Sequence, residues 1–259
     1  MSSPPVISLT TDFGLDDWFV GTMKGVILDR CPDSRIVDLS HHIPPGDLQA
    51  GAFALAASYK FFPKQTVHLV VVDPGVGSDR NSIAVKTQEF TFVGPDNGVL
   101  SWALALESIE SIHRLENLEL FRGELSNTFH GRDVFAPIAA ELAGGKRIEE
   151  VGPETSDYLR LHRPEPIDSG GSIQGEVVYI DRFGNAMTNI PGNSIGETGR
   201  ATFGDGKECD LRNCYADSPH GVLLAVRGST GFIEIAVNGG DAATTHGLKV
   251  GDEVSLARQ

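Results

Sequence analysis

The feature that most constrains the fold is a run of mostly apolar, β-branched residues from 66 to 72, which ends in Asp73 and a turn. Such a strand is typical of a sheet that is covered on both faces, because its residues hardly alternate with polar ones. Pro74 then removes a backbone donor, and Gly75 and Gly77 permit conformations that other residues avoid. The pattern predicts that Asp73 lies at the carboxyl end of a buried strand, where open α/β sheets bind ligands. A simpler explanation is that Asp73 only caps the turn.

The first 165 residues alternate strand and helix patterns. The expected elements are a strand at 6–10, a helix at 20–31, a strand at 35–39, a helix at 47–60, the strand at 66–72 and a hairpin of 82–87 with 90–93. The hairpin predicts a mixed, mostly parallel sheet. We therefore expect an N-terminal three-layer α/β domain over residues 1–165.

The second part of the chain has a different pattern. Residues 166–172 are rich in Pro, Gly and Ser and are expected to form a linker. The strand candidates beyond it are short and separated by turns, at 173–180, 200–203, 221–226, 232–237 and 253–257. No helix is expected there. The pattern predicts a small C-terminal β-barrel over residues 173–259.

Composition narrows the class of protein. The 259 residues carry a formal net charge of −14 without a cluster of Lys or Arg, which disfavours nucleic acid and favours a cationic or neutral small molecule. Three cysteines cannot all pair, so a reducing cytoplasm is expected. The sequence begins without a basic region and an apolar run, and no apolar stretch is long enough to span a bilayer, so no membrane association is expected.

Four loops of the first domain concentrate polar residues where strands end. They contain Asp12, Asp16 and Asp17; His41 and His42; Asp73 and Arg80; and His130 and Asp133. Clustering at the carboxyl ends of strands is what a pocket requires. Taken singly, each has a simpler explanation, since Asp12 or Asp17 can cap a helix and His41 can bond to nearby backbone groups.

Spacing argues against three other kinds of site. The triplet 12–14 and the segment 130–133 resemble protein-kinase motifs, but in reversed order and without room upstream for a nucleotide lobe. There is no His-Glu-x-x-His, and Cys209 and Cys214 lack a second pair, so no metal is expected. No Gly-x-Gly-x-x-Gly follows the first strand, which argues against NAD. In the second domain, residues 181–185 are polar but also fit an ordinary hairpin turn.

Six motifs occur in one order across most of the chain. They are Thr-Asp-Phe-Gly at 11–14, Asp-Leu-Ser-His at 38–41, Val-Asp-Pro-Gly-Val-Gly at 72–77, Gly-Pro-Asp-Asn-Gly at 94–98, Phe-His-Gly-Arg-Asp at 129–133 and Asp-Arg-Phe-Gly-Asn at 181–185. Together they resemble the S-adenosylmethionine hydrolase family, also called S-adenosylmethionine hydroxide adenosyltransferases, relatives of the fluorinase and chlorinase enzymes. The resemblance implies an α/β domain followed by a β-barrel, and a homotrimer whose active sites lie between the N-terminal domain of one subunit and the C-terminal domain of its neighbour. It also implies that S-adenosylmethionine is split with water into adenosine and methionine, without a cofactor.

The resemblance implies roles for individual residues. The implied catalytic set is Asp73, Arg80 and His130. The implied substrate contacts are Asp12 for the ribose hydroxyls, Asp16, Asp17 and Trp18 near the methionine end, Asp181, Phe183 and Asn185 in the barrel, and Ser229, Val237 and Gly239 for methionine and adenine. A neutral thioether leaves from a sulfonium, so no general acid is required. Positioning of a water in line with the carbon–sulfur bond can contribute roughly 7 to 11 kcal/mol. We expect Arg80 to attract the incipient hydroxide, while Asp73 and His130 orient the water and receive its proton.

Two alternatives stay open. A halogenase could use the same scaffold, but a carboxylate such as Asp73 beside the nucleophile would repel an anion. Gly131 stands where the fluorinase has a serine, which argues against fluoride, although the chlorinase shares a glycine. A non-catalytic protein that binds an adenosyl ligand is the second alternative, and the intact set of Asp73, Arg80 and His130 argues against it.

Overall fold

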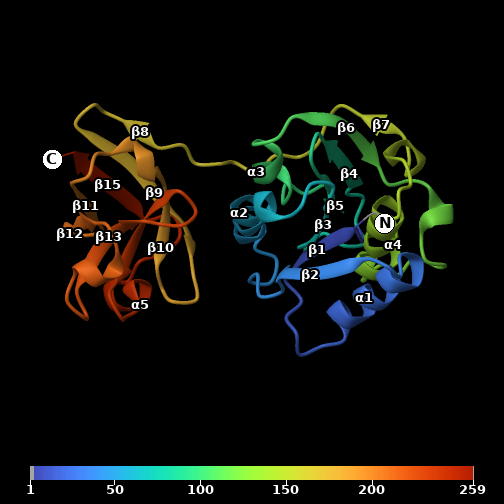
Figure 1. Cartoon of the computed structure of the whole chain (residues 1–259), viewed down its shortest axis with the longest axis horizontal. Helices are drawn as coiled ribbons and strands as arrows, with labels where there is room; N and C mark the ends of the chain where they lie inside the picture. The colour runs from blue at the N-terminus through green and yellow to red at the C-terminus, as the bar shows by residue number, and fades with distance from the viewer. Residues whose placement is uncertain (1–2, 259) are drawn as a thin grey trace. The chain divides into compact units, whose positions relative to one another are not determined.

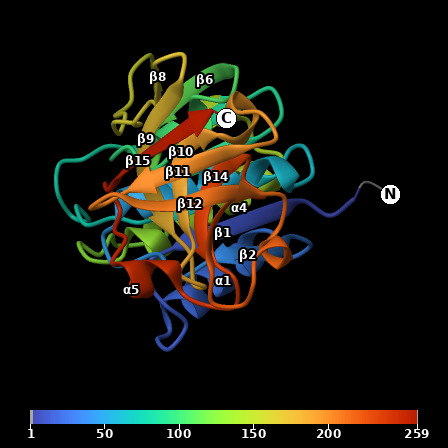
Figure 2. The same cartoon turned by 90° about the vertical axis from the view of Figure 1, so that its left-hand side faces the viewer.

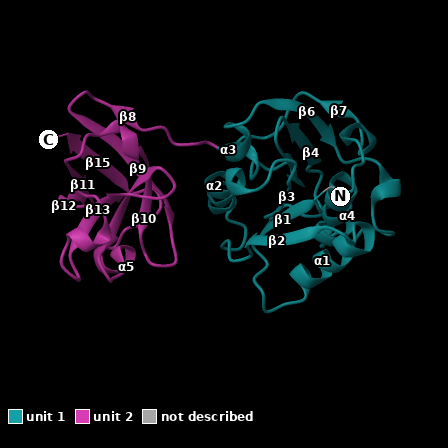
Figure 3. Cartoon of the chain, in the orientation of Figure 1, with its two compact units in different colours: residues 1–161 teal, residues 162–259 magenta. Residues whose placement is uncertain are grey.

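The structure is a computed structural model that describes residues 3–258. The chain divides into two compact units, residues 1–161 and residues 162–259 (Figure 3). No helix within residues 3–258 is long and apolar enough to cross a membrane.

Unit 1 is built on a seven-stranded sheet with the order β2-β1-β3-β5-β4-β6-β7. The strands are β1 Val6–Thr11, β2 Arg35–Ser40, β3 Val67–Val71, β4 Ser82–Thr87, β5 Thr91–Pro95, β6 Ile109–Arg114 and β7 Glu154–Thr155. The first four strands of this order pair in parallel, and the remaining pairings are antiparallel. The expected mixed sheet and the β4–β5 hairpin are confirmed.

Helices cover both faces of this sheet. They are α1 Phe19–Arg30, α2 Leu48–Ser58, α3 Ser101–Leu104 and α4 Ala136–Ala143. In Figure 1, α2 and α3 lie on one side of the sheet and α1 and α4 on the other. All five residues of β3 are buried, as expected for a strand between two helical layers. Leu69 belongs to the core under α1 and α4, whereas Val72 contacts Gly51 of α2 on the opposite face. The three-layer α/β fold is confirmed.

Unit 2 is a closed β-barrel, as the turn-punctuated strands predict. Its strands are β9 Ser172–Ile180, β10 Ala186–Pro191, β11 Gly199–Phe203, β12 Lys207–Arg212, β13 Leu223–Arg227, β14 Phe232–Val237 and β15 Glu253–Arg258. The pairing order runs β10-β14-β13-β12-β11-β15-β9, and β9 pairs with β10 to close it. Figure 2 shows β9, β15 and β11 side by side in this barrel.

Two details of unit 2 differ from the expectation. A helix, α5 Ala242–His246, is present where none was expected. It is only five residues long, so it has no periodic apolar pattern; Asp241 caps its start and Gly247, with a φ of 73°, ends it. In addition, the strand β8 Ile167–Asp168 lies within the expected linker and pairs with β9. The pairing is a short hairpin, with Asp168 opposite Ile173, and a strand of two residues is too short to show a pattern among Pro, Gly and Ser.

Candidate active site

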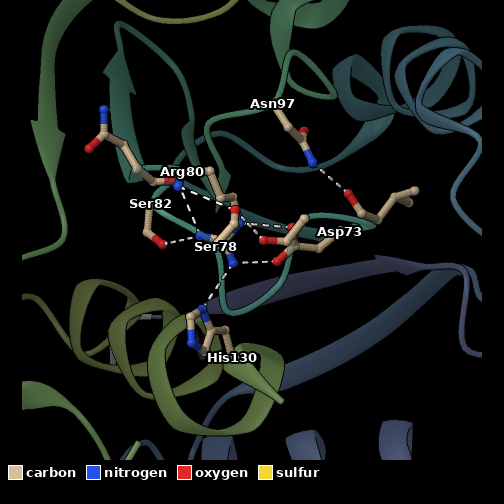
Figure 4. Close-up of polar contacts among 9 residues, drawn as sticks. Asp73, Ser78, Arg80, Ser82, Asn97 and His130 are labelled. Carbon is tan, nitrogen blue, oxygen red and sulfur yellow. Dashed lines mark hydrogen bonds and ion pairs between the residues drawn. The ribbon is translucent and has the colours of Figure 1, made fainter. Parts of the chain in front are cut away.

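A cluster of Asp73, Arg80 and the partly buried His130 lies where β3 ends (Figure 4). The Nε of Arg80 donates to Oδ1 of Asp73 at 2.8 Å, and Nη2 donates to Oδ2, so the pair is bidentate. The same Nη2 lies 2.9 Å from Nδ1 of His130. The side chains of Asp73 and Arg80 are only 4% and 9% exposed. Arg80 therefore contacts both other members of the expected catalytic set.

The turn after β3 holds the two charged residues of this cluster together. Val76 N donates to the carbonyl of Asp73, and the Ser78 hydroxyl donates to the carbonyl of Gly75 at 2.6 Å. Gly77 has a φ of 77°, and a Cβ at this position would lie 2.2 Å from the carbonyl oxygen of Asn127. Only glycine fits there without a shift of the backbone.

Every guanidinium N–H of Arg80 has an acceptor. Besides its bonds to Asp73 and His130, Arg80 donates from Nη1 to the Ser82 hydroxyl at 2.8 Å and to the carbonyl of Asn81 at 3.2 Å. Its guanidinium also lies 5.4 Å from the centre of the Phe135 ring. These contacts fix the guanidinium in one orientation, since a guanidinium offers five donors in a rigid fork.

His130 is held as a neutral ring with a defined tautomer. Because a guanidinium cannot accept a hydrogen bond, Nδ1 of His130 must be the acceptor toward Arg80, which leaves the ring proton on Nε2. Burial and the charge of Arg80 lower the pKa of His130, which favours this neutral form. The ring stands at the start of a π-helical turn, Gly131–Phe135, that leads into α4. Such turns are frequent at functional sites.

The loops after β1 and β2 meet the loop after β3, as their parallel pairing requires. Asp12 accepts from Gly46 N at 2.8 Å, and a Cβ at Gly46 would lie 3.6 Å from Cβ of Pro74. His41 is 2% exposed; its Nδ1 lies 2.8 Å from the Thr11 hydroxyl. Its Nε2 lies 3.1 Å from Asp38. Asp12 is thus brought next to the turn that carries Asp73.

Other candidates from the sequence do not join this cluster. Asp133 is buried but forms an ion pair with Arg132 and accepts from Ser126 N, which is a structural role. His42, Asp16 and Asp17 are exposed. Trp18 is 69% exposed and stacks against Phe19, with ring centres 5.2 Å apart. Within residues 3–258, no three His, Cys, Asp or Glu side chains are placed to hold a metal ion.

Unit 2 contains a pocket of about 750 Å³. All six candidates from the barrel line it, namely Asp181, Phe183, Asn185, Ser229, Val237 and Gly239. Asp181 organises the loop, because its Oδ1 accepts from the backbone N of Phe183 and Asn185, and its Oδ2 accepts from the Asn185 amide. Phe183 is 74% exposed at the rim. The pocket also contains Tyr215 and Glu234, which the sequence motifs did not identify.

Comparison with known families accounts for both units. The model of the SAM hydroxide adenosyltransferase N-terminal domain matches residues 7–152, and that of the C-terminal domain matches residues 175–255. The chain belongs to this family. The resemblance that the six motifs carry is confirmed.

Known relatives cover nearly the whole chain. A protein from Salinispora tropica named (R)-S-adenosyl-L-methionine hydrolase is 38% identical, with 99% of each chain covered. A Thermus thermophilus protein with the same name is 40% identical, over 97% of this chain and 99% of its own. A fluorinase from Actinoplanes is more distant, at 27% identity over 98% of both chains.

A solved structure of similar fold agrees with the family match. The crystal structure of an uncharacterized conserved protein from Thermotoga maritima has a TM-score of 0.92 and 39% identity, and covers 97% of this chain and 100% of its own. Both units therefore have counterparts in one known chain.

Proposed function

We propose that this protein hydrolyses S-adenosylmethionine to adenosine and L-methionine by in-line attack of water on the 5′ carbon of the ribose. The observation that carries the proposal is the buried ion pair of Asp73 and Arg80, in contact with His130, in a chain of this family. Relatives that are 38% and 40% identical are named as hydrolases of this substrate. No separate cofactor is required, because the sulfonium already makes methionine a good neutral leaving group.

The cluster supports a division of labour around one water molecule. Asp73 is the group that receives the proton of the water, because it is the only anion of the cluster. His130 offers its Nε2–H, so we propose that it donates a hydrogen bond to the water oxygen and orients it. Arg80 has no spare N–H and acts through its charge and by holding both partners in place. This revises the expectation that His130 also receives the proton.

The substrate contacts and the assembly are proposals as well. We propose that Asp12 holds the ribose hydroxyls, that Asp16, Asp17 and Trp18 face the methionine end, and that the unit 2 pocket residues contact the adenine and the amino acid. The site would combine unit 1 of one subunit with unit 2 of a neighbour in a homotrimer. A cytoplasmic location would give access to the substrate.

A turnover assay tests the proposed reaction. Incubation with S-adenosylmethionine, with and without chloride, should release adenosine and methionine in both cases and no 5′-chloro-5′-deoxyadenosine, as measured by chromatography. Tight binding without any product would favour a binding protein instead, and a chlorinated product would favour a halogenase.

Replacement of Asp73 tests the carboxylate. We expect Asp73→Asn to lower kcat by about 10³-fold or more, because the proton acceptor is lost. Binding of S-adenosylmethionine, measured by calorimetry, should remain detectable. Asp79→Asn is the matched control, because Asp79 lies in the same loop but is exposed; it should turn over normally. Near-normal turnover of Asp73→Asn would contradict the mechanism.

A further inference from the structure

Glu234 is a buried carboxylate in the unit 2 pocket that the reaction proposed above does not use. Strand alternation in β14 sends Ile233 and Ile235 into the barrel core and Glu234 to the opposite face. There it pairs across the strands with Met187 and Val226, which also line the pocket. Glu234 is only 3% exposed, although most residues of this charge lie on the surface.

Only one of the two carboxylate oxygens of Glu234 has a partner. The Tyr215 hydroxyl donates to Oε2 at 3.0 Å, and no other hydrogen bond or ion pair reaches Glu234 from the described residues, 3–258. Oε1 lies against Gly228, where a Cβ would be 1.8 Å away, so the carboxylate fits only because residue 228 is glycine. Oε1 is not among the fully buried atoms without a partner in the described residues, so it is accessible from the pocket, where a ligand can supply the donor.

The charges in the pocket indicate which donor fits. Asp181 also lines it, and burial together with this second carboxylate raises the pKa of Glu234. Arg227 is the one cationic side chain among the lining residues of the described chain. Its guanidinium is occupied, since it donates to the backbone carbonyls of Gly192 at 3.0 Å and of Gly196. The pocket therefore has two carboxylates, and within the described residues neither forms an ion pair with a cation.

We propose that Glu234 recognises the α-ammonium group of the substrate and thereby selects adenosyl sulfoniums that carry a free amino group. The inference rests on the proposed function. An ammonium offers both a compensating charge and N–H donors for Oε1. A sulfonium has charge but no N–H, and the adenine amine has N–H but no charge, so neither satisfies Glu234 fully. Tyr215 holds the carboxylate in position as a neutral donor, since burial and Glu234 raise the pKa of its hydroxyl to about 12.

The test compares two substrates in the full-length protein. One is S-adenosylmethionine, and the other is the same sulfonium without its α-amino group; both release adenosine on hydrolysis. We expect Glu234→Gln to raise KM for S-adenosylmethionine by about 10- to 100-fold with kcat within about threefold, because a charge-assisted hydrogen bond is lost. KM for the analogue should change by less than about twofold. Tyr215→Phe should also reduce the preference for S-adenosylmethionine over the analogue, measured as the ratio of their KM values, by about threefold.

Control measurements separate recognition from general damage. Glu253→Gln removes a carboxylate on β15 that does not line the pocket, and should leave both KM values unchanged. If Glu234→Gln raises KM for both substrates by the same factor, or leaves the ratio of the two KM values as in the wild type, the inference is wrong. If Glu234→Gln does not fold, a wild-type preference in Tyr215→Phe overturns the inference by itself. Calorimetric binding of the two ligands gives the same comparison without turnover, so absence of hydrolysis in the wild type would contradict the proposed function alone.

Discussion

Arg80 holds the other two residues of the candidate cluster in place. Its five N–H groups are shared among Asp73, His130, Ser82 and the carbonyl of Asn81. The bond to Nδ1 of His130 fixes the tautomer of the ring, and the bidentate pair fixes the plane of the Asp73 carboxylate. A lysine could not replace it, because an ammonium lacks the planar fork.

The His130 tautomer leads to a pH prediction. Burial and Arg80 lower the pKa of His130, so the ring is neutral above its ordinary pKa of about 6.5. Protonation of Nδ1 would place the N–H of His130 against the Nη2–H of Arg80, so that two donors would face each other. We expect the titration of His130 to leave kcat/KM unchanged above about pH 6.5. As the pH falls through the lowered pKa of His130, kcat/KM should decrease. A pH profile of kcat/KM for the wild type and for His130→Gln, which should lack this acid limb, checks this. An acid limb centred above pH 6.5 would contradict the assignment.

At the same scale, the sequence indicated some residues of the two candidate sites and not others. Asp73, Arg80 and His130 stand in motifs whose local composition is unusual, and the structure brings them into one cluster, while their catalytic roles stay a prediction. Glu234 lies within an otherwise apolar strand, and its partner Tyr215 is 19 residues away. Their contact depends on barrel pairing, which no local pattern reports. The sequence also could not show that Asp133 is occupied by Arg132 rather than by a ligand.

Among the elements, the turn between β3 and β4 leaves no room for a side chain at Gly77. Gly77→Ala would place a Cβ 2.2 Å from the carbonyl oxygen of Asn127 at a φ of 77°. We expect the free energy of unfolding to fall by about 1 to 3 kcal/mol, and kcat to fall by about 10-fold or more as Asp73 and Arg80 shift. Urea unfolding and turnover assays measure both.

Gly123→Ala is the matched control for this turn. Gly123 also has a positive φ, 58°, but a Cβ there would meet no atom within 4 Å. It should lose about 1 kcal/mol from backbone strain and keep its activity. Equal losses of activity in the two variants would show that the contact with Asn127 is unimportant.

Elements with strong local patterns were predicted well, and the others were not. The strand β3 and the helix α2, with its Asp47 cap, follow directly from composition. The strands β6, β10 and β12 were missed, because polar residues interrupt their apolar pattern. The short helix α5 was missed because five residues are too few for a period to appear.

For the whole molecule, the proposed trimer makes a testable claim about how sites are shared. If each site joins unit 1 of one subunit to unit 2 of the next, then Asp73→Asn and Asn185→Ala damage opposite halves of it. Each variant alone should be nearly inactive. Mixed trimers, co-expressed with two tags and purified through both, should regain about one third of the wild-type turnover, because one of the three sites in the ring is intact. Recovery of no activity, or a monomeric mass in solution, would contradict the shared site.

The limits of the folding domains also remain a prediction at this scale. Composition places them at residues 165 and 173, the compact units meet at residue 161, and the family models end at 152 and begin again at 175. The boundary is hard to read from the sequence because the short strand β8 pairs with β9 just after the change in composition.

The turn that joins β3 to β4 also has an evolutionary consequence. Both charged members of the Asp73–Arg80 pair lie within the ten residues that connect these two strands, from 72 to 81, whereas the proposed adenosyl contacts lie elsewhere in the chain. In the proposed mechanism, the segment that selects the nucleophile is therefore a short connection that can be replaced by itself. A lineage could replace the β3–β4 connection by an uncharged loop and so change which nucleophile attacks. The contacts with the adenosyl group of the substrate would be kept. Divergence between water-using and halide-using relatives would then require the replacement of one short connection rather than the rebuilding of a pocket.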